Sequence, residues 1–307
     1  MSRSRLGAGS LAFILVLTLG IALLSCKKAP APPTPPARLI NFNELIQQKN
    51  NAALQKQPLK TKGDFDRERS EVQDIILRAF QNDPPWFIKK ITGVNRPYLF
   101  HAITDCERTM RVGDYDDGGK WVCDPHSLPE KTIVYSFGVG ENISFDTDMA
   151  SLFGAEVHMF DPAPSVAKNF RNFQSGQRCG PGRIYYQPLG LGPITSETDL
   201  VLEGKKCPQK TLTDIARSLG HDHLDILKID IEGGEYGALK QMLSSGTLDS
   251  LRVKQLLIEF HFWDDALFKE FMETIGMLKK QGYILFHKEF NPQAADVCAE
   301  YAFVKIR

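Results

Sequence analysis

Residues 132–161 read TIVYSFGVGENISFDTDMASLFGAEVHMFD. The apolar run Ile133-Val134-Tyr135 predicts a strand, and Gly138 and Gly140 follow it almost at once. A second apolar run ends at Asp161. Glycines after a strand let the backbone approach a ligand closely, and an acid about 20 residues later grips the ribose diol in nucleotide-binding βαβ units. The stretch therefore predicts a pocket for a cofactor that contains adenosine.

A missing glycine narrows the choice of cofactor. Ile143 stands where the dinucleotide fingerprint has its third glycine, which lets the helix end pack closely beneath a pyrophosphate. S-adenosylmethionine contains adenosine but no phosphate, so it needs only the first glycines and the ribose acid. The sequence therefore favours S-adenosylmethionine over a dinucleotide.

Strands and helices alternate from residue 132 to the end of the chain. We expect strands near 132–137, 155–160, 183–188, 224–230, 253–260, 282–287 and 300–306, and helices near 142–153, 164–174, 211–219, 235–245 and 264–280. This alternation predicts a Rossmann-like α/β fold, with a mostly parallel sheet and helices on both faces. The last two strands lack an intervening helix, which predicts an antiparallel hairpin at one edge.

Several short motifs resemble a known family. Residues 224–235, LDILKIDIEGGE, resemble the D-x-E-G-x-E signature of FkbM-type S-adenosylmethionine-dependent methyltransferases. The segment from Cys106 to Arg307 resembles the methyltransferase-like protein 24 family. That resemblance is carried by Cys106 and Cys123 around DGGKW, by YSFG at 135–138, FDP at 160–162 and IEFH at 258–261.

The resemblance implies a class I methyltransferase fold and a set of cofactor residues. It places the cofactor on Gly138, Gly140 and Asp161, with Asp230 on the floor of the site. Ser136 stands where methyltransferases usually carry an acid that orders the methionine end of the cofactor. We expect Glu141 or Asp230 to bind the methionine end of the cofactor instead. Ser136 stays among the cofactor-binding candidates.

Methyl transfer from a sulfonium is an in-line substitution in which a base removes the acceptor's proton. His261 is the leading candidate base, because it follows a strand near the cleft and imidazole titrates near neutrality. Glu232 is the second candidate and Asp230 the third. The alternative roles are a core histidine for His261 and a helix N-terminal acid for Glu232. Asp230 and Glu232 could instead hold Mg²⁺, but we assign no metal to the site.

The predicted activity is methylation of a hydroxyl on an unidentified small-molecule, glycan or protein acceptor. The preference for oxygen comes from the FkbM resemblance. The competing hypothesis is a catalytically silent lumenal binding module that keeps the fold. Lys and Arg balance Asp and Glu at 37 each, so no bulk charge predicts a nucleic-acid partner.

The N-terminal region predicts targeting rather than catalysis. The apolar run Leu11–Leu24 is shorter than the roughly 20 residues that span a bilayer comfortably, so residues 1–28 are predicted to be a signal peptide or signal anchor. Residues 29–63 form a Pro-rich and polar linker with a short helix around 44–57. Residues 64–131 hold a lead-in helix over 65–81 and a Cys-bracketed loop, and 132–307 form the catalytic domain.

This organisation predicts a protein of the secretory pathway, either secreted or a single-pass type II membrane protein in contact with the membrane through an uncleaved N-terminal segment. A bacterial lipoprotein, from the box that ends at Cys26, is the minor alternative. In an oxidising lumen Cys106 and Cys123 are expected to form a disulfide, and Cys179 and Cys207 could form a second. Cys298 is then left over.

Three further motifs carry less weight. The sequon at Asn142 lies in the expected cofactor loop, so it should escape glycosylation if the site is used. Tyr236 and Lys240 have a dehydrogenase-like spacing that we interpret as accidental. The run His221-Asp222-His223 has no other Cys or His close in sequence, so we interpret it as solvated surface rather than a metal site.

Overall fold

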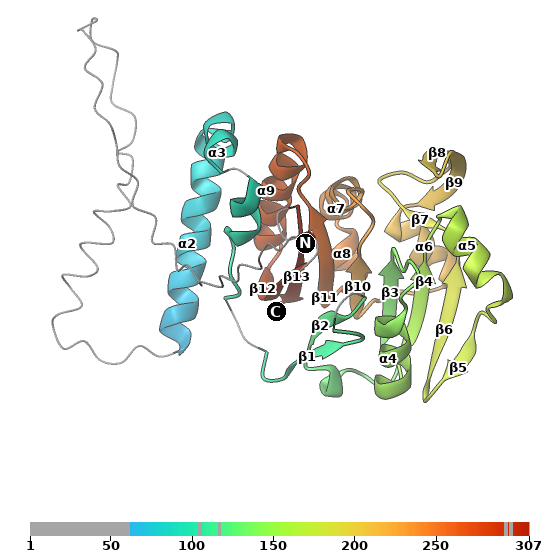
Figure 1. The fold of residues 1–307 in the computed structure, drawn as a ribbon. Helices are drawn as coiled ribbons and strands as arrows, with labels where there is room; N and C mark the ends of the chain where they lie inside the picture. The colour runs from blue at the N-terminus through green and yellow to red at the C-terminus, as the bar shows by residue number, and fades with distance from the viewer. Residues whose placement is uncertain are drawn as a thin grey trace, which may run out of the picture. The chain divides into compact units, whose positions relative to one another are not determined.

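A mostly parallel sheet forms the centre of the compact unit that contains the described residues (Figure 1). The computed structural model describes residues 62–91, 93–103, 106–115, 118–291, 294 and 297–306. In sheet order the eight strands are β12 (Tyr283–Phe290), β13 (Cys298–Lys305), β11 (Gln255–His261), β10 (Ile226–Ile229), β3 (Ile133–Phe137), β4 (Glu156–Phe160), β6 (Gly182–Gln187) and β5 (Gln177–Cys179). β11, β10, β3, β4 and β6 are parallel, whereas β13 runs antiparallel to both β11 and β12. The predicted fold class and its antiparallel edge hairpin are confirmed.

Six helices pack on one face of this sheet around a single apolar core. They are α2 (Lys62–Asn82), α3 (Pro84–Lys90), α6 (Leu212–Leu219), α7 (Glu235–Ser244), α8 (Thr247–Ser250) and α9 (Asp265–Lys280). Phe271 of α9 lies at the centre of this core, in contact with the rings of Phe260 and Tyr301 on the sheet. Since α2 and α3 pack on α9, the predicted lead-in helix belongs to the same compact unit as the sheet.

The opposite face is covered by fewer elements, and these include an unexpected hairpin. Helices α4 (Ser144–Phe153) and α5 (Pro164–Asn169) pack here beside the antiparallel strands β1 (Thr109–Val112) and β2 (Lys120–Cys123). Short 3-10 turns cover Gly93–Tyr98, Pro125–Ser127 and Phe170–Asn172. Helices therefore lie on both faces, as predicted.

Local signals explain where several helices begin and end. Asp83 caps α3 by accepting from the N–H of Trp86, and Asp264 caps α9 by accepting from Leu267. Such caps satisfy backbone donors that the first turn of a helix leaves unpaired. Helix α6 ends at Gly220, whose φ of +73° is readily adopted by glycine.

Two elements of the structure are absent from the prediction. The Gly- and Asp-rich loop between Cys106 and Cys123 connects two strands, β1 and β2, that were not predicted. A second missed element is a small sheet of β7 (Gly190–Leu191), β9 (Lys205–Lys210) and β8 (Ser196–Leu202). Glu203 and Gly204 between β8 and β9 both have positive φ, the geometry of a tight two-residue hairpin turn, and Gly204 was the sequence signal for it.

In the described part of the chain the cysteines form one bonded pair and three free thiols. The predicted disulfide between Cys106 and Cys123 is present, with Cα atoms 5.4 Å apart. The second predicted pair is wrong, because Cys179 and Cys207 are both free. Cys298 is free and buried. The single disulfide ties the start of the hairpin region to the end of β2.

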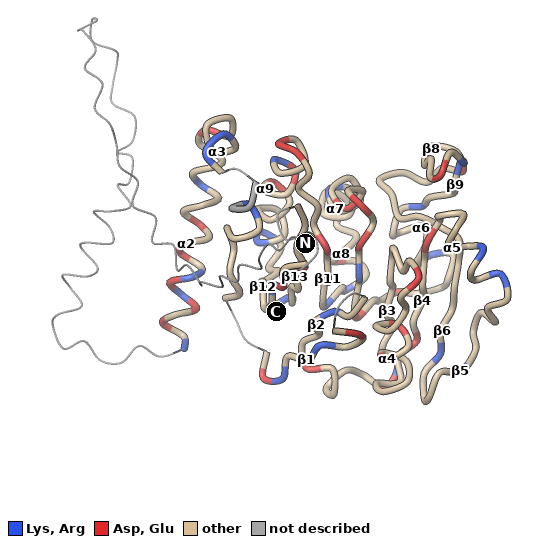
Figure 2. Tube along the Cα trace, viewed as in Figure 1, with Lys and Arg blue, Asp and Glu red and all other residues tan. Residues whose placement is uncertain are grey.

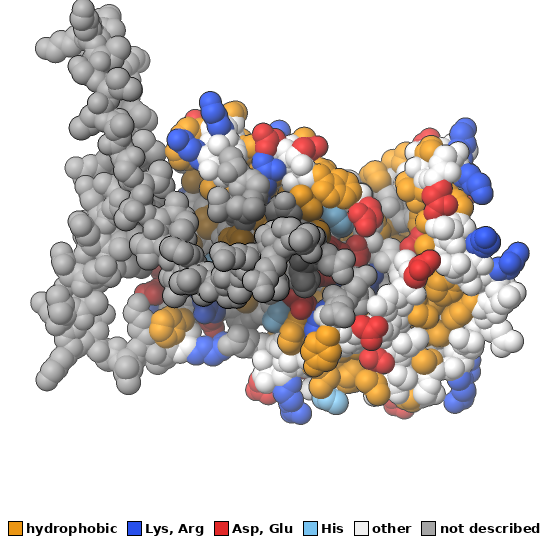
Figure 3. All heavy atoms as spheres, viewed as in Figure 1, with side chains coloured by type: hydrophobic (Ala, Val, Ile, Leu, Met, Phe, Trp, Pro, Cys, Tyr) orange, Lys and Arg blue, Asp and Glu red, His pale blue; other side chains and the backbone are white. Residues whose placement is uncertain are grey.

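Charged residues of both signs are spread over the described elements (Figure 2). Lys, Arg, Asp and Glu alternate along the elements (Figure 2), and hydrophobic and charged side chains mix on the face shown in Figure 3. No helix in the described part of the chain combines the length and apolarity needed to cross a bilayer. The predicted targeting segment, the linker up to residue 61 and its short helix lie outside the described residues.

Candidate active site

A cavity of about 410 Å³ opens where the parallel strands β3, β4, β10 and β11 end. Its lining comes from the loops after these strands, from the β1–β2 hairpin and from the segment between β12 and β13. The polar lining side chains are Glu141, Asn142, Asp161, Lys228, Asp230, Glu232, Glu259, His261, Asn291 and Cys298. The convergence of strand ends that the sequence predicted therefore produces one cavity.

The backbone after β3 approaches the cavity through two glycines. Gly138 has a φ of +72°, and a Cβ there would lie 1.6 Å from the carbonyl oxygen of Asp230. Gly140 has a φ of +56°, and a Cβ there would meet no protein atom within 4 Å. Position 138 must therefore be glycine, because the backbone of Asp230 lies against it. Gly140 instead leaves open space next to the backbone turn.

Asp161 is held rigidly at the end of β4. One carboxylate oxygen accepts from the N–H of Gly140 at 3.0 Å, and the other accepts from Ala163 at 2.9 Å. The residue is 7% exposed and lines the cavity. Because each oxygen has more than one acceptor site, the carboxylate can still accept from a diol placed over Gly140.

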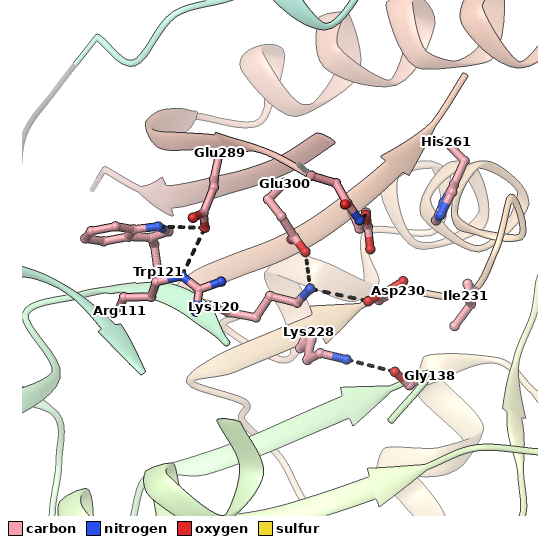
Figure 4. Close-up of polar contacts among 12 residues, drawn as sticks. Arg111, Lys120, Trp121, Gly138, Lys228, Asp230, Ile231, His261, Glu289 and Glu300 are labelled. Atoms are coloured by element: carbon pink, nitrogen blue, oxygen red, sulfur yellow. Dashed lines mark hydrogen bonds and ion pairs between the residues drawn. The ribbon is translucent and has the colours of Figure 1, made fainter. Parts of the chain in front are cut away.

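Asp230 lies on the floor of the cavity inside a buried network of charges (Figure 4). Lys120 of β2 reaches across from the hairpin, with its Nζ 3.3 Å from Asp230 and also bonded to Glu300. Burial alone would raise the pKa of Asp230, but the charges of Lys120 and Lys228 outweigh it and lower that pKa to about 2. Burial raises the pKa of Glu300 to about 7 despite Lys120. Asp230 therefore stays ionised.

A second buried lysine supports the glycine turn. Lys228 lies in the middle of the apolar strand β10 and donates to the carbonyl oxygen of Gly138 at 2.9 Å. Nearby, Glu259 accepts from Asn291 at 3.1 Å, and burial followed by the charge of Asp230 raises the pKa of Glu259. Lys228 thus ties the strand of Asp230 to the turn that lies above it.

His261 closes the other end of the cavity. Its Nδ1 lies 2.9 Å from buried Glu235, and its Nε2 lies 3.5 Å from Glu232, which is largely exposed. Burial would lower the pKa of His261, but the hydrogen bond and charge of Glu235 raise it to about 9. The near-neutral titration assumed from the sequence is therefore not met. Trp263 lies beside the imidazole, with ring centroids 5.1 Å apart.

Most predicted site residues lie together, and one does not. Glu141, Asp161, Asp230, Glu232 and His261 line the cavity with the two glycines. Ser136 does not, because it lies within β3 and is fully buried there. The sequence analysis missed Lys120, Lys228 and Glu235; a lysine inside the apolar run ILKI was the available signal for Lys228.

Donor atoms in the cavity could also hold a metal ion. Those of Asp230, Glu232 and His261 lie within 4.8 Å of one another, and so do those of Glu259, His261 and Cys298. The first group contains Asp230 and Glu232, the pair considered above as an alternative Mg²⁺ site, and Lys120 already balances the charge of Asp230 there.

A family model described as "Methyltransferase domain" matches residues 99–305, more than half of the chain. The chain belongs to this methyltransferase family. Its sheet, glycine turn and strand-end acids are those of a class I methyltransferase fold. The matched range begins before β1, so the hairpin that carries Lys120 lies inside the methyltransferase domain.

Two curated relatives support the family assignment. The chain is 24% identical to "Probable methyltransferase-like protein 24" of Homo sapiens over 173 residues, which cover 53% of this chain and 44% of the human protein. It is 23% identical to the Rattus norvegicus protein of the same name over 164 residues, covering 50% and 42%. The predicted resemblance to this family is confirmed. The methyltransferase chain spans less than half the length of these relatives.

Similar solved structures include a Methanococcus jannaschii fibrillarin pre-rRNA processing protein, with a TM-score of 0.37, 9% identity and coverage of 66% of this chain and 84% of that one. The METTL16 MTase domain gives a TM-score of 0.33 at 12% identity, with coverage of 58% and 61%. Likenesses of this strength add nothing to what the family match and the strand order establish.

Proposed function

We propose that this protein transfers the methyl group of S-adenosylmethionine to a hydroxyl group. The proposal rests on the surroundings of Gly140. The space next to this residue is open, and its N–H donates to the carboxylate of Asp161 at the end of β4. This arrangement suits an adenosine whose ribose hydroxyls donate to Asp161.

The charge of the cavity favours a cationic cofactor over a phosphorylated one. Among the described lining residues there are five carboxylates and one lysine, Lys228, whose Nζ already bonds to the carbonyl oxygen of Gly138. A pyrophosphate would meet five carboxylates, with only Lys228 and the protonated imidazole of His261 as cations among the described lining residues. A sulfonium carries positive charge, so ionised Asp230 and its neighbours attract it.

The acceptor would enter on the side of His261 and Glu232. The acceptor oxygen attacks the methyl carbon in line with the C–S bond, the electron pair of that bond returns to sulfur, and the oxygen's proton passes to a base. We infer that the base is His261, held in position by Glu235. Since its pKa is raised to about 9, the rate of methyl transfer should rise with pH toward that value.

We also propose that the acceptor group is a hydroxyl and that the protein works in the secretory pathway. The FkbM-like D-x-E-G-x-E run supports oxygen, and the Cys106–Cys123 disulfide supports an oxidising compartment. The acceptor itself is a small molecule, a glycan or a protein.

Calorimetric titration of the full-length chain with S-adenosylmethionine, S-adenosylhomocysteine and NAD tests the cofactor. We expect the first two to bind and NAD not to bind. Gly140→Asn should abolish binding, because asparagine tolerates positive φ but fills the space above the turn. Gly220→Asn is the matched control: its φ is +73°, its Cβ position is equally open, and it lies outside the cavity.

Failure of both S-adenosyl compounds to bind the folded wild-type chain would favour the catalytically silent module. Binding of NAD would refute the cofactor assignment. Equal loss of binding in Gly140→Asn and Gly220→Asn would indicate a general folding defect, which thermal unfolding of both variants would detect.

A further inference from the structure

Strand β4 begins with two metal-binding side chains on one face. Side chains two residues apart in a strand point to the same side, so Glu156 and His158 lie together. Their side chains are in contact, with His158 Nε2 2.8 Å from Glu156 Oε1. In the sheet register His158 lies opposite Tyr135 of β3.

The third side chain comes from the loop after α6. His221 follows Gly220, the residue that ends this helix, and its Nε2 lies 3.4 Å from the same oxygen of Glu156. Ligand atoms of Glu156, His158 and His221 all lie within 4.8 Å of one another. A carboxylate oxygen and two imidazole nitrogens from two segments of the chain therefore converge on one point.

The surroundings hold both rings in position. The Nδ1 of His221 lies 2.6 Å from the hydroxyl of Tyr135, which leaves its Nε2 directed at Glu156. The ring of His158 stacks on Tyr185, with centroids 4.5 Å apart and an interplanar angle of 5°. A ring nitrogen bonded to a neighbouring polar group is the usual way in which proteins orient a metal-binding histidine.

The exposed fraction of the side chain increases from 5% for His158 to 15% for His221 and 39% for Glu156. An ion could therefore enter past Glu156 and keep a water molecule as an additional ligand. The point lies at the amino end of β4, five residues before Asp161, or roughly 16 Å along an extended strand. It is separate from the cavity, whose lining includes none of the three residues.

We propose that Glu156, His158 and His221 bind a Zn²⁺ ion. Two imidazoles and one carboxylate form a donor set that zinc accepts, whereas Mg²⁺ and Ca²⁺ prefer oxygen ligands alone. Ligands about 2.0 to 2.1 Å from a tetrahedral ion lie roughly 3.3 Å from one another. The 3.4 Å distance between His221 and Glu156 already fits, and the 2.8 Å distance between His158 and Glu156 needs to lengthen by about half an ångström.

The bound ion would have a structural role. It would link strand β4 to the loop between α6 and β10, two segments that are more than 60 residues apart in the sequence. An ion that binds the folded state alone stabilises it by mass action. The site does not depend on methyl transfer, and it would exist even if the cavity bound no cofactor.

The test uses the full-length chain, stripped with a chelator and titrated with Co²⁺ as a spectroscopic substitute for Zn²⁺. We expect one ion per chain, visible absorption typical of a four-coordinate cobalt site, displacement by Zn²⁺, and a higher unfolding temperature with Zn²⁺ than with Mg²⁺. Glu156→Gln and His221→Gln should each weaken Co²⁺ binding at least 10-fold, as loss of one ligand of three requires.

Two control variants separate this site from the alternatives. His223→Gln changes the neighbouring histidine, which bonds to Asp222, and should leave Co²⁺ affinity unchanged. His261→Ala removes a donor from the two groups in the cavity that include a histidine and should also leave Co²⁺ affinity unchanged. Absence of a Co²⁺ band in the wild-type protein would overturn the proposal. So would a band that survives Glu156→Gln and His221→Gln but disappears in His261→Ala.

Discussion

Replacing Lys120 by methionine should destabilise the protein more than any exposed ion-pair substitution. The side chain of Lys120 is only 2% exposed, and it bonds to Asp230 and Glu300, which are 19% and 18% exposed. Methionine keeps the apolar stem and removes the charge. Two carboxylates then remain close together without their shared cation.

The structure gives the size of the effect. At the 3.3 Å separation of Lys120 and Asp230, an effective dielectric constant of 20 gives an attraction of about 5 kcal/mol. Part of this is offset, because methionine needs no desolvation and Glu300, with a pKa raised to about 7, can take up a proton instead. Breaking a buried pair typically costs about 3 to 5 kcal/mol, and we expect a loss of that size.

Urea unfolding at pH 7.5 and 25 °C, followed by far-UV circular dichroism, measures the free energy of unfolding. Lys240→Met is the control: Lys240 also bonds to two acids, Glu270 and Glu273, but it is 36% exposed, and its loss should cost less than about 1 kcal/mol. Adding Glu300→Gln to Lys120→Met should restore part of the stability. A loss below about 1 kcal/mol in Lys120→Met would refute the reasoning.

Asp161→Ala should weaken S-adenosylmethionine binding by about 1.5 to 3 kcal/mol, because an ionised acceptor for the ribose diol is lost; calorimetry that returns wild-type affinity would remove Asp161 from the site. His261→Ala should slow methyl transfer by about 10² to 10⁴ while leaving cofactor affinity nearly intact, and normal turnover in the folded variant would move the search to Glu232. In the wild-type protein, log kcat/KM should rise with pH and level off near pH 9, since the imidazole accepts a proton only after losing its own; a flat profile between pH 6 and 9 would exclude it as the base. Non-reducing peptide mapping should recover Cys106 bonded to Cys123, and free thiols at both would contradict the disulfide.

The sequence predicted the sheet well because its signal is local. Apolar runs such as Ile133–Phe137 and Gln255–His261 are buried on both sides, as central parallel strands must be, and their composition is visible without a structure. Two of the expected helices, near 211–219 and 264–280, match α6 and α9 closely, and in the structure they are bounded by Gly220 and Asp264. Elements with weak local signals were missed: β8 is mostly exposed and polar, so no apolar pattern marks it.

The candidate site was predictable only where it follows strand ends. Asp161 and Asp230 could be found by counting from glycines and apolar runs. Lys120 could not, because it reaches the floor from a hairpin 110 residues earlier in the chain than its partner Asp230. The same limit explains the interpretation of His221 as solvated surface. Its neighbours Glu156 and His158 are distant in sequence and meet it only through the packing of β4 against the loop after α6.

The two glycines of the turn after β3 differ in what they reveal about relatives of this chain. A side chain at position 138 would collide with the backbone at Asp230, so a relative that has lost all catalysis must still keep glycine there to fold. A Cβ at position 140 would meet no protein atom within 4 Å, and the positive φ there would cost a non-glycine residue about 1 to 2 kcal/mol. In a relative that no longer binds the cofactor, selection for glycine at position 140 is therefore lost. Loss of the second glycine with retention of the first would mark a relative that has become a pseudoenzyme, before any assay is run.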